Sequence, residues 1–159
     1  MSQLDLDSEE DNDPVQQWVT YHLEDEVYGV NVIQVQEVLR IIEITPVPGA
    51  PNYVLGIINL RGSVVTVIDT RSRFGLMPKE SDDLTRIIVV EINNNVIGML
   101  VDSVSEVVYL HQSEVDTAPS FNSDDCSRFI QGVANREEGL LILVDVNKLL
   151  ADEQASDLF

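Results

Sequence analysis

Short apolar runs separated by polar turns dominate the pattern of this chain. The first two runs, residues 18–23 and 27–30, lie on either side of the polar turn Glu24-Asp25-Glu26. Five further runs cover residues 54–60, 64–69, 87–92, 96–101 and 140–146. Most of these runs are rich in β-branched residues and are too short for core helices. The pattern therefore predicts an all-β protein made of small barrels whose strands are mostly buried.

Helical signals are few and short. Asn31 is a favourable cap residue, and apolar residues follow it at helical spacing at Val32, Val35 and Leu39, so a helix is predicted there. Asp69 and Asp145 each precede a segment of one or two helical turns. Three prolines exclude a regular element over residues 45–51, and residues 78–83 and 111–127 are predicted to be polar loops.

The chain also repeats itself. Gly29 and Gly98 are each followed eight residues later by a Glu-Val pair, at residues 37–38 and 106–107. Gly56 and Gly132 each begin a Gly-x-x-Asn motif and precede an aspartate by 13 residues. The repeat predicts a first barrel over about residues 15–83 and a second over about residues 84–151, with strand exchange between them left open. A barrel this small has little core of its own, so we expect the two to share an interface.

Composition narrows the classes of partner and compartment. The 159 residues contain 28 Asp and Glu against 9 Lys and Arg, a formal charge of −19, which disfavours nucleic acid and anionic membranes as partners. The first 13 residues hold six acids and no base, so residues 1–14 are predicted to be a disordered acidic tail. No basic and apolar leader or membrane-length apolar run occurs, and Cys126 is the single cysteine, so we expect a cytosolic protein.

The chemistry expected of an enzyme is missing from the sequence. There is no glycine-rich phosphate loop, no metal-ligand spacing and no nucleophile elbow. His22 and His111 stand alone, and the neighbouring carboxylates make Cys126 a poor nucleophile. The carboxylate pair Glu137-Glu138 precedes Gly139 in a predicted turn and is interpreted as solvated. We therefore expect no catalytic residues, no metal and no cofactor.

Arg61 is the residue that a structural role explains least. It lies in Asn59-Leu60-Arg61-Gly62, between two apolar strands, where Gly62 supplies a positive φ for a hairpin. Its counterpart in the second repeat is Glu137, so the barrel does not require a base at this position. Two interpretations remain open: an ordinary exposed hairpin arginine, or an arginine that binds a partner.

Several motifs together resemble the CheW family of bacterial chemotaxis coupling proteins. They are Tyr28-Gly29-Val30, Val35-Gln36-Glu37-Val38, and the segments at residues 56–62, 67–74, 96–107 and 141–150. They occur in family order and spacing over about residues 16–151. The resemblance implies two intertwined SH3-like five-stranded β-barrels with a few short helices.

The resemblance also implies a function without catalysis. A CheW-like adaptor couples the cytoplasmic tips of methyl-accepting chemoreceptors to the regulatory domain of the CheA histidine kinase, in arrays beneath the inner membrane. The matching receptor-binding positions are Val35, Glu37, Gly56, Arg61 and Val107. A CheW-like adaptor of another chemosensory pathway and a small-molecule-binding double barrel remain as alternatives.

Overall fold

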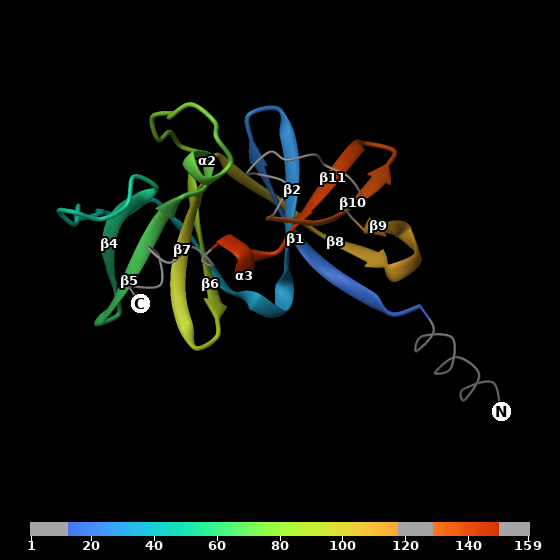
Figure 1. The fold of residues 1–159 in the computed structure, drawn as a ribbon, viewed down its shortest axis with the longest axis horizontal. Helices are drawn as coiled ribbons and strands as arrows, with labels where there is room; N and C mark the ends of the chain where they lie inside the picture. The colour runs from blue at the N-terminus through green and yellow to red at the C-terminus, as the bar shows by residue number, and fades with distance from the viewer. Residues whose placement is uncertain (1–12, 118–128, 150–159) are drawn as a thin grey trace.

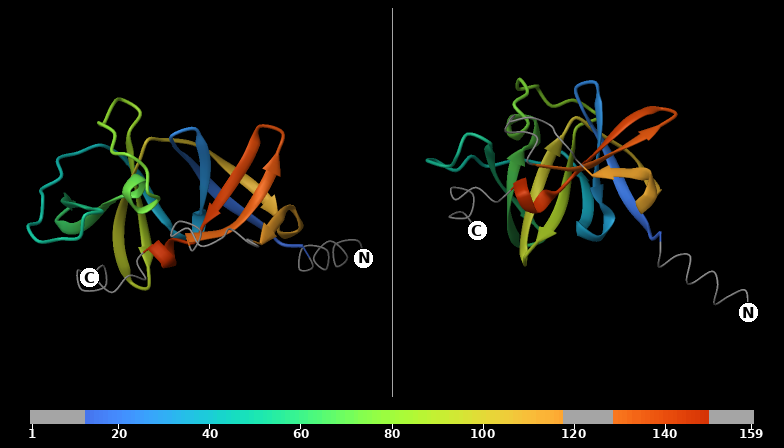
Figure 2. Two further views of the ribbon diagram at one scale, coloured as in Figure 1. Left: turned by 45° about the horizontal axis from the view of Figure 1, so that its top comes forward. Right: turned by 45° about the vertical axis from the view of Figure 1, so that its right-hand side comes forward.

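The structure is a computed structural model, and it describes residues 13–117 and 129–149. Three predictions fall on residues that the structure does not describe: those for residues 1–12 of the tail, for residues 118–127 of the expected loop, and for Cys126. Two sheets lie side by side along the long axis of the molecule, and the turned views show the same division (Figures 1 and 2).

One sheet, which we call the five-strand barrel, has the order β3-β6-β7-β5-β4. Its strands are β3 (Val35–Arg40), β4 (Val54–Leu60), β5 (Ser63–Asp69), β6 (Arg86–Ile92) and β7 (Asn95–Val101). The other sheet, the six-strand barrel, has the order β8-β1-β2-β11-β10-β9. Its strands are β1 (Val15–Leu23), β2 (Glu26–Asn31), β8 (Ser103–His111), β9 (Val115–Thr117), β10 (Ile130–Arg136) and β11 (Gly139–Val144).

The two barrels exchange their hairpins. The hairpin β1–β2 opens the first sequence repeat but pairs with β8 and β11 of the second. The hairpin β6–β7 opens the second repeat but pairs with β3 and β5 of the first. Each barrel therefore contains strands from both repeats, and the barrels do not coincide with residues 15–83 and 84–151. The prediction of two intertwined barrels is confirmed by this topology.

The sixth strand of the larger sheet is the short strand β9, which pairs with β10. In the five-strand barrel a single bridge between Thr45 and Ile57 of β4 is found at the corresponding place. β9 and the 3-10 turn η2 (Gln112–Glu114) lie within the segment predicted to be a loop over residues 111–127. Asp13 of the expected tail also contacts this turn, since its carboxylate accepts hydrogen bonds from the backbone and side chain of Ser113 at 2.9 Å.

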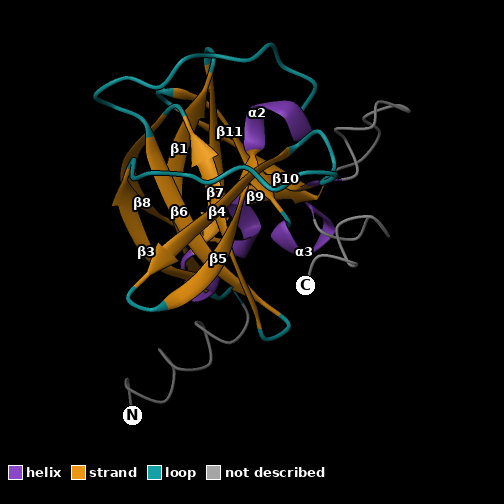
Figure 3. Ribbon diagram, turned by 90° about the vertical axis from the view of Figure 1, so that its left-hand side faces the viewer, coloured by secondary structure: helices purple, strands orange, loops and turns teal. Residues whose placement is uncertain are grey.

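The helix predicted after Asn31 is wrong. A single 3-10 turn, η1 (Val32–Gln34), follows the Asn31 cap, and the chain then continues as strand β3. In β3, half-buried and exposed residues alternate, and the strand pairs with β6. Pairing with a distant strand has overridden a local helical spacing. The two other short helices are present, as α2 (Thr70–Arg73) and α3 (Val146–Leu149), seen among the strands in Figure 3.

The largest core cluster is shared by the two barrels. Tyr21, Tyr28 and Val30 enter it from the six-strand barrel, and residues such as Ile88 and Met99 enter it from the five-strand barrel. Phe74, which follows α2, lies 5.0 Å from the ring of Tyr28 between ring centroids. Because the largest cluster of buried apolar side chains contains residues of both barrels, we expect the barrels to unfold together. No helix in the described part of the chain is long and apolar enough to cross a membrane.

Candidate functional site

The β4–β5 turn presents Arg61 at the end of the five-strand barrel. Leu60 and Ser63 pair with each other, so Arg61 and Gly62 form a two-residue turn. Their φ angles are 52° and 89°, so both residues are left-handed, whereas the sequence predicts a positive φ for Gly62 alone. The Gly62 N–H donates to Asn59 Oδ1 at 3.0 Å. The turn leaves the Arg61 side chain 69% exposed.

Glu37 holds the guanidinium of Arg61 from the other edge of the same barrel. Arg61 Nη1 donates to Glu37 Oε1 at 3.3 Å, and Nη2 pairs with Oε2. Since β3 and β4 are the two edge strands of the sheet, this bidentate pair joins its edges. The hydrogen bonds from Arg61 hold the pKa of Glu37 below its ordinary value, and those same bonds raise the pKa of Arg61. Both groups are therefore charged at neutral pH.

Arg61 also lines an open depression of about 590 Å³. Its other walls come from β3, β4, β5, β7 and the β6–β7 turn, and they include Gln36, Val64 and Asn94. Gln36 Nε2 donates to Glu91 Oε1 at 3.0 Å, while Val64 is 70% exposed. Val64 is absent from the residues predicted from the sequence; its signal was a β-branched residue two positions after the turn glycine. The depression thus combines a fixed cation, amide groups and one exposed apolar side chain.

Two of the predicted site residues contribute through the fold. Val35 is half-buried and packs against the shared core. Gly56 is buried at a bulge of β4 with φ 150°, and a Cβ there would lie 2.1 Å from the carbonyl oxygen of Thr45. Only a glycine allows the chain at Thr45 and Pro46 to approach this closely. Val35 is half-buried and Gly56 has no side chain, so neither offers a partner a well-exposed side chain to contact.

Val107 belongs to a different sheet from the Arg61–Glu37 pair. It is on β8 of the six-strand barrel, opposite Val19 of β1, and is 45% exposed. Its counterpart in the first repeat is Val38, which is 40% exposed and which is not among the predicted site residues. The Glu-Val pairs of the sequence repeat, at residues 37–38 and 106–107, make the two valines equivalent positions.

The remaining candidates for chemistry have structural or solvent contacts. His22 Nδ1 is 3.2 Å from Ser103 Oγ, and His111 Nδ1 is 3.3 Å from the carbonyl oxygen of Asp13. Glu137 and Glu138 are exposed. Across residues 13–117 and 129–149, no group of three or more His, Cys, Asp or Glu side chains is placed to hold a metal ion.

Comparison with known proteins gives one consistent result. The CheW-like domain family matches residues 17–154. Chemotaxis protein CheW of Klebsiella aerogenes is 33% identical, and the match spans 87% of this chain and 84% of that protein. Chemotaxis protein CheW of Bacillus subtilis is 36% identical over 80% of this chain and 82% of its own length. The crystal structure of the scaffolding protein TtCheW from Thermoanaerobacter tengcongensis superimposes with a TM-score of 0.81 at 32% identity, covering 87% of this chain and 94% of that one.

Proposed function

Because this chain belongs to the CheW-like domain family, we propose that it is a non-catalytic chemotaxis adaptor that couples receptors to a kinase. Its partners in this proposal are the cytoplasmic tips of methyl-accepting chemoreceptors and the regulatory domain of a CheA histidine kinase. The adaptor would be cytoplasmic and would be recruited to receptor arrays beneath the inner membrane. The relatives described above are chemotaxis and scaffolding proteins by name, which supports this assignment.

The observation that carries the receptor-binding part of the proposal is the exposed and oriented guanidinium of Arg61. An arginine fork recognises carboxylates and carbonyl oxygens, and both are offered by helix surfaces and helix C-termini. Glu37 uses one edge of the fork and restricts its rotation, while 69% of the Arg61 side chain remains open to a partner. In a chain of net charge −19, an exposed base at a hairpin tip is a scarce feature.

The other proposed site residues complete a surface that a helical receptor tip would contact. Val107 offers an exposed apolar side chain on the six-strand barrel, and Val38 offers an equivalent one on the five-strand barrel. Val35 and Gly56 keep the strands that carry Glu37 and Arg61 in position. Apolar contacts flanked by a charged anchor are the usual mode of helix recognition by a protein surface.

Titration of Arg61→Glu against a receptor-tip fragment tests the proposal. Loss of a hydrogen-bonded charge followed by charge reversal should weaken binding about tenfold or more. The fold should be retained, because the side chain is exposed and the turn conformation needs no base. Binding of the kinase regulatory domain should survive, because that interface is expected on other surfaces.

Lys79→Glu is the matched control, since it makes the same change in net charge at another exposed ion pair, with Asp82 at 2.9 Å. It should leave receptor binding nearly unchanged. Equal losses for the two variants would show that net charge, and not Arg61, governs binding. Unchanged binding in Arg61→Glu would remove this residue from the site.

A further inference from the structure

Arg71, on α2, is the most completely bonded buried charge among the described residues. Its side chain is 6% exposed. Nη1 donates to Asp102 Oδ2 at 2.6 Å, Nη2 pairs with Glu24 Oε1, and Nε donates to the carbonyl oxygen of Met77 at 2.8 Å. Burial opposes its charge, but the two carboxylates outweigh burial and raise the pKa of Arg71. The guanidinium therefore stays charged, and each of its three nitrogens is bonded to a different residue.

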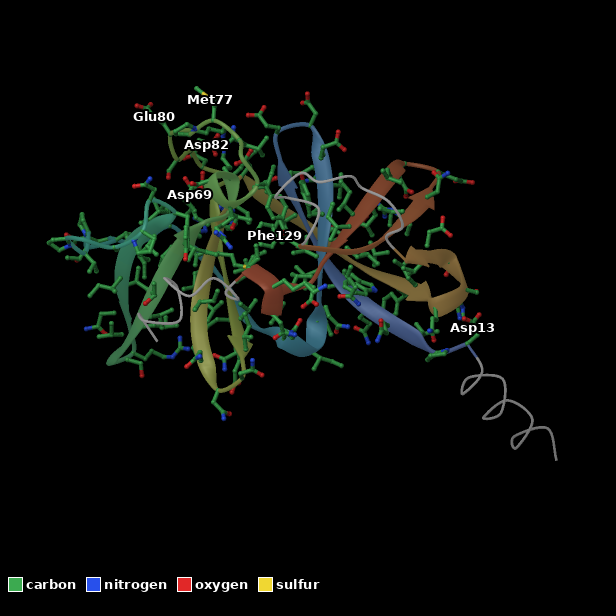
Figure 4. All side chains as sticks on the ribbon, in the orientation of Figure 1. Asp13, Asp69, Met77, Glu80, Asp82 and Phe129 are labelled. Atoms are coloured by element: carbon green, nitrogen blue, oxygen red, sulfur yellow. The ribbon has the colours of Figure 1, made fainter. Side chains whose placement is uncertain are left out.

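These bonds reach parts of the molecule that belong to different barrels. Glu24 lies in the β1–β2 turn of the six-strand barrel, while Met77 lies in the loop after α2 of the five-strand barrel. Asp102 is the single residue between β7 and β8, where the chain crosses from one barrel to the other. Its Oδ2 also accepts the Glu24 N–H at 2.9 Å, and its own N–H donates to the His22 carbonyl at 3.1 Å. Figure 4 shows Asp69 and Met77 at this end of the molecule, around α2.

The second crossing between the barrels is built differently. The chain passes from β2 to β3 through η1, which contains no buried residue and is capped by Asn31, whose Oδ1 accepts the Ile33 N–H at 3.0 Å. In the described chain, no ion pair involves η1. The repeat counterpart of Arg71 is the exposed Asn147 of α3. Thus charges secure one of the two crossings, and the arrangement is not a requirement of the repeat.

Stability alone gives a weak reason for such a cluster. Buried ion pairs lose much of their attraction to desolvation, and apolar side chains of similar shape often serve equally well. The barrels already share an apolar core that includes Tyr28, Ile88 and Phe74. Apolar contacts are not directional, whereas the bonds of a guanidinium fork are.

We propose that the cluster of Arg71, Glu24, Asp102 and the Met77 carbonyl is an orientation clamp, which fixes the angle between the two barrels. The shared core holds the barrels together, and the clamp selects one of the angles that this core permits. Partners that contact both barrels would then meet a preset surface. The inference concerns the geometry of the free protein and does not depend on the identity of those partners.

The test compares the orientation of the barrels by residual dipolar couplings of backbone amides in the full chain. In the wild type, both barrels should fit one alignment tensor. The triple variant Arg71→Met, Glu24→Gln, Asp102→Asn removes the charges together and leaves none unpaired. We expect it to unfold cooperatively but to need two different tensors, with amide protection at the β7–β8 crossing lowered about tenfold or more.

Arg136→Gln is the matched control, because it removes a partly buried arginine whose partner Glu106 lies within the same barrel. It should keep a single tensor. Arg71→Lys retains the charge without the fork, and it should retain the fold but loosen the angle. A single, unchanged tensor in both the triple variant and Arg71→Lys would overturn the clamp. Failure of the triple variant to fold would also overturn it, because the shared core would then not suffice to hold the barrels together.

Discussion

The two barrels each carry a glutamate–arginine pair, and they use it in opposite ways. In the five-strand barrel the arginine is open and the acid is sheltered, since the side chains of Arg61 and Glu37 are 69% and 28% exposed. In the six-strand barrel the side chain of Arg136 is 16% exposed and that of Glu106 is 61% exposed. The pairs also differ in closeness: Arg61 hydrogen-bonds both oxygens of Glu37, but Arg136 Nη1 is 3.9 Å from Glu106 Oε2.

The two pairs differ because Arg136 lies one residue earlier along its hairpin than Arg61 does. Arg61 is a turn residue in the left-handed conformation, whereas Arg136 is the last strand residue, paired with Gly139. Glu137 and Glu138 take the turn positions of the second hairpin. The side chain of a strand residue stands roughly perpendicular to the sheet. That of Arg136 is largely buried there, whereas the side chain of the turn residue Arg61 is exposed. The two hairpins show that a shift of one residue is enough to expose the arginine in one barrel and bury most of it in the other.

The largest effect that separates the barrels should come from their equivalent glycines. Gly56→Ala forces a Cβ against the Thr45 carbonyl at a left-handed φ and should cost roughly 3 kcal/mol of unfolding free energy. Gly132→Ala meets Val115 Cγ1 at 2.8 Å and the Asp116 carbonyl at 2.9 Å, without a left-handed φ, and should cost roughly 1–2 kcal/mol. Urea unfolding of both variants measures the difference. A smaller loss for Gly56→Ala than for Gly132→Ala would reverse the expected order of the two glycines.

The next largest difference is expected between substitutions of the two arginines, in the free energy of unfolding. Arg136→Ala removes a mostly buried side chain and should lower the free energy of unfolding by roughly 1–3 kcal/mol. Arg61→Ala should leave the urea midpoint nearly unchanged, because the Arg61 side chain is 69% exposed and an ion pair of an exposed arginine adds little stability. Adding Glu106→Ala to Arg136→Ala should cost little more, since the two groups are 3.9 Å apart. If Arg61→Ala proved the more destabilising variant, Arg61 would have to be regarded as a structural residue.

The smallest expected effect is on how the stability of the protein depends on pH in the acidic range. Glu37 has a lowered pKa in the folded protein, so its contribution to stability is present above its unfolded-state pKa and is lost as pH falls through the lower folded value. In Arg61→Gln the pKa of Glu37 should return toward its ordinary value, and this small dependence should disappear. NMR titration of the Glu37 carboxyl measures the change, with Arg136→Gln as the control. An identical titration in Arg61→Gln and the wild type would show that the ion pair does not form in solution.

Most of the local structure could be predicted from the pattern of residues along the chain. Apolar runs predicted the strands, Asp69 predicted α2, and its carboxylate does accept the Arg71 N–H at 3.1 Å. The repeat predicted two barrels, and Gly62 predicted the hairpin that displays Arg61. These features depend on the conformational preferences of a few residues that are neighbours in the sequence. The absence of motifs for catalysis was also visible at this level, although the receptor-binding roles of the site residues stay predictions.

The pairing of the strands could not be predicted from the chain and is known from the three-dimensional fold. Hairpin exchange, and the choice of β3 over a helix after Asn31, depend on pairings between residues far apart in the chain, such as Val38 with Ile88. The same holds for Glu37 with Arg61 and for Arg71 with Glu24 and Asp102, whose sequence separations carry no local signal. Two similar repeats offer each hairpin two chemically similar barrels, so local pattern cannot choose between them. Burial of the shared core and satisfaction of the charged groups are properties of the assembled molecule, and they favour the exchanged arrangement.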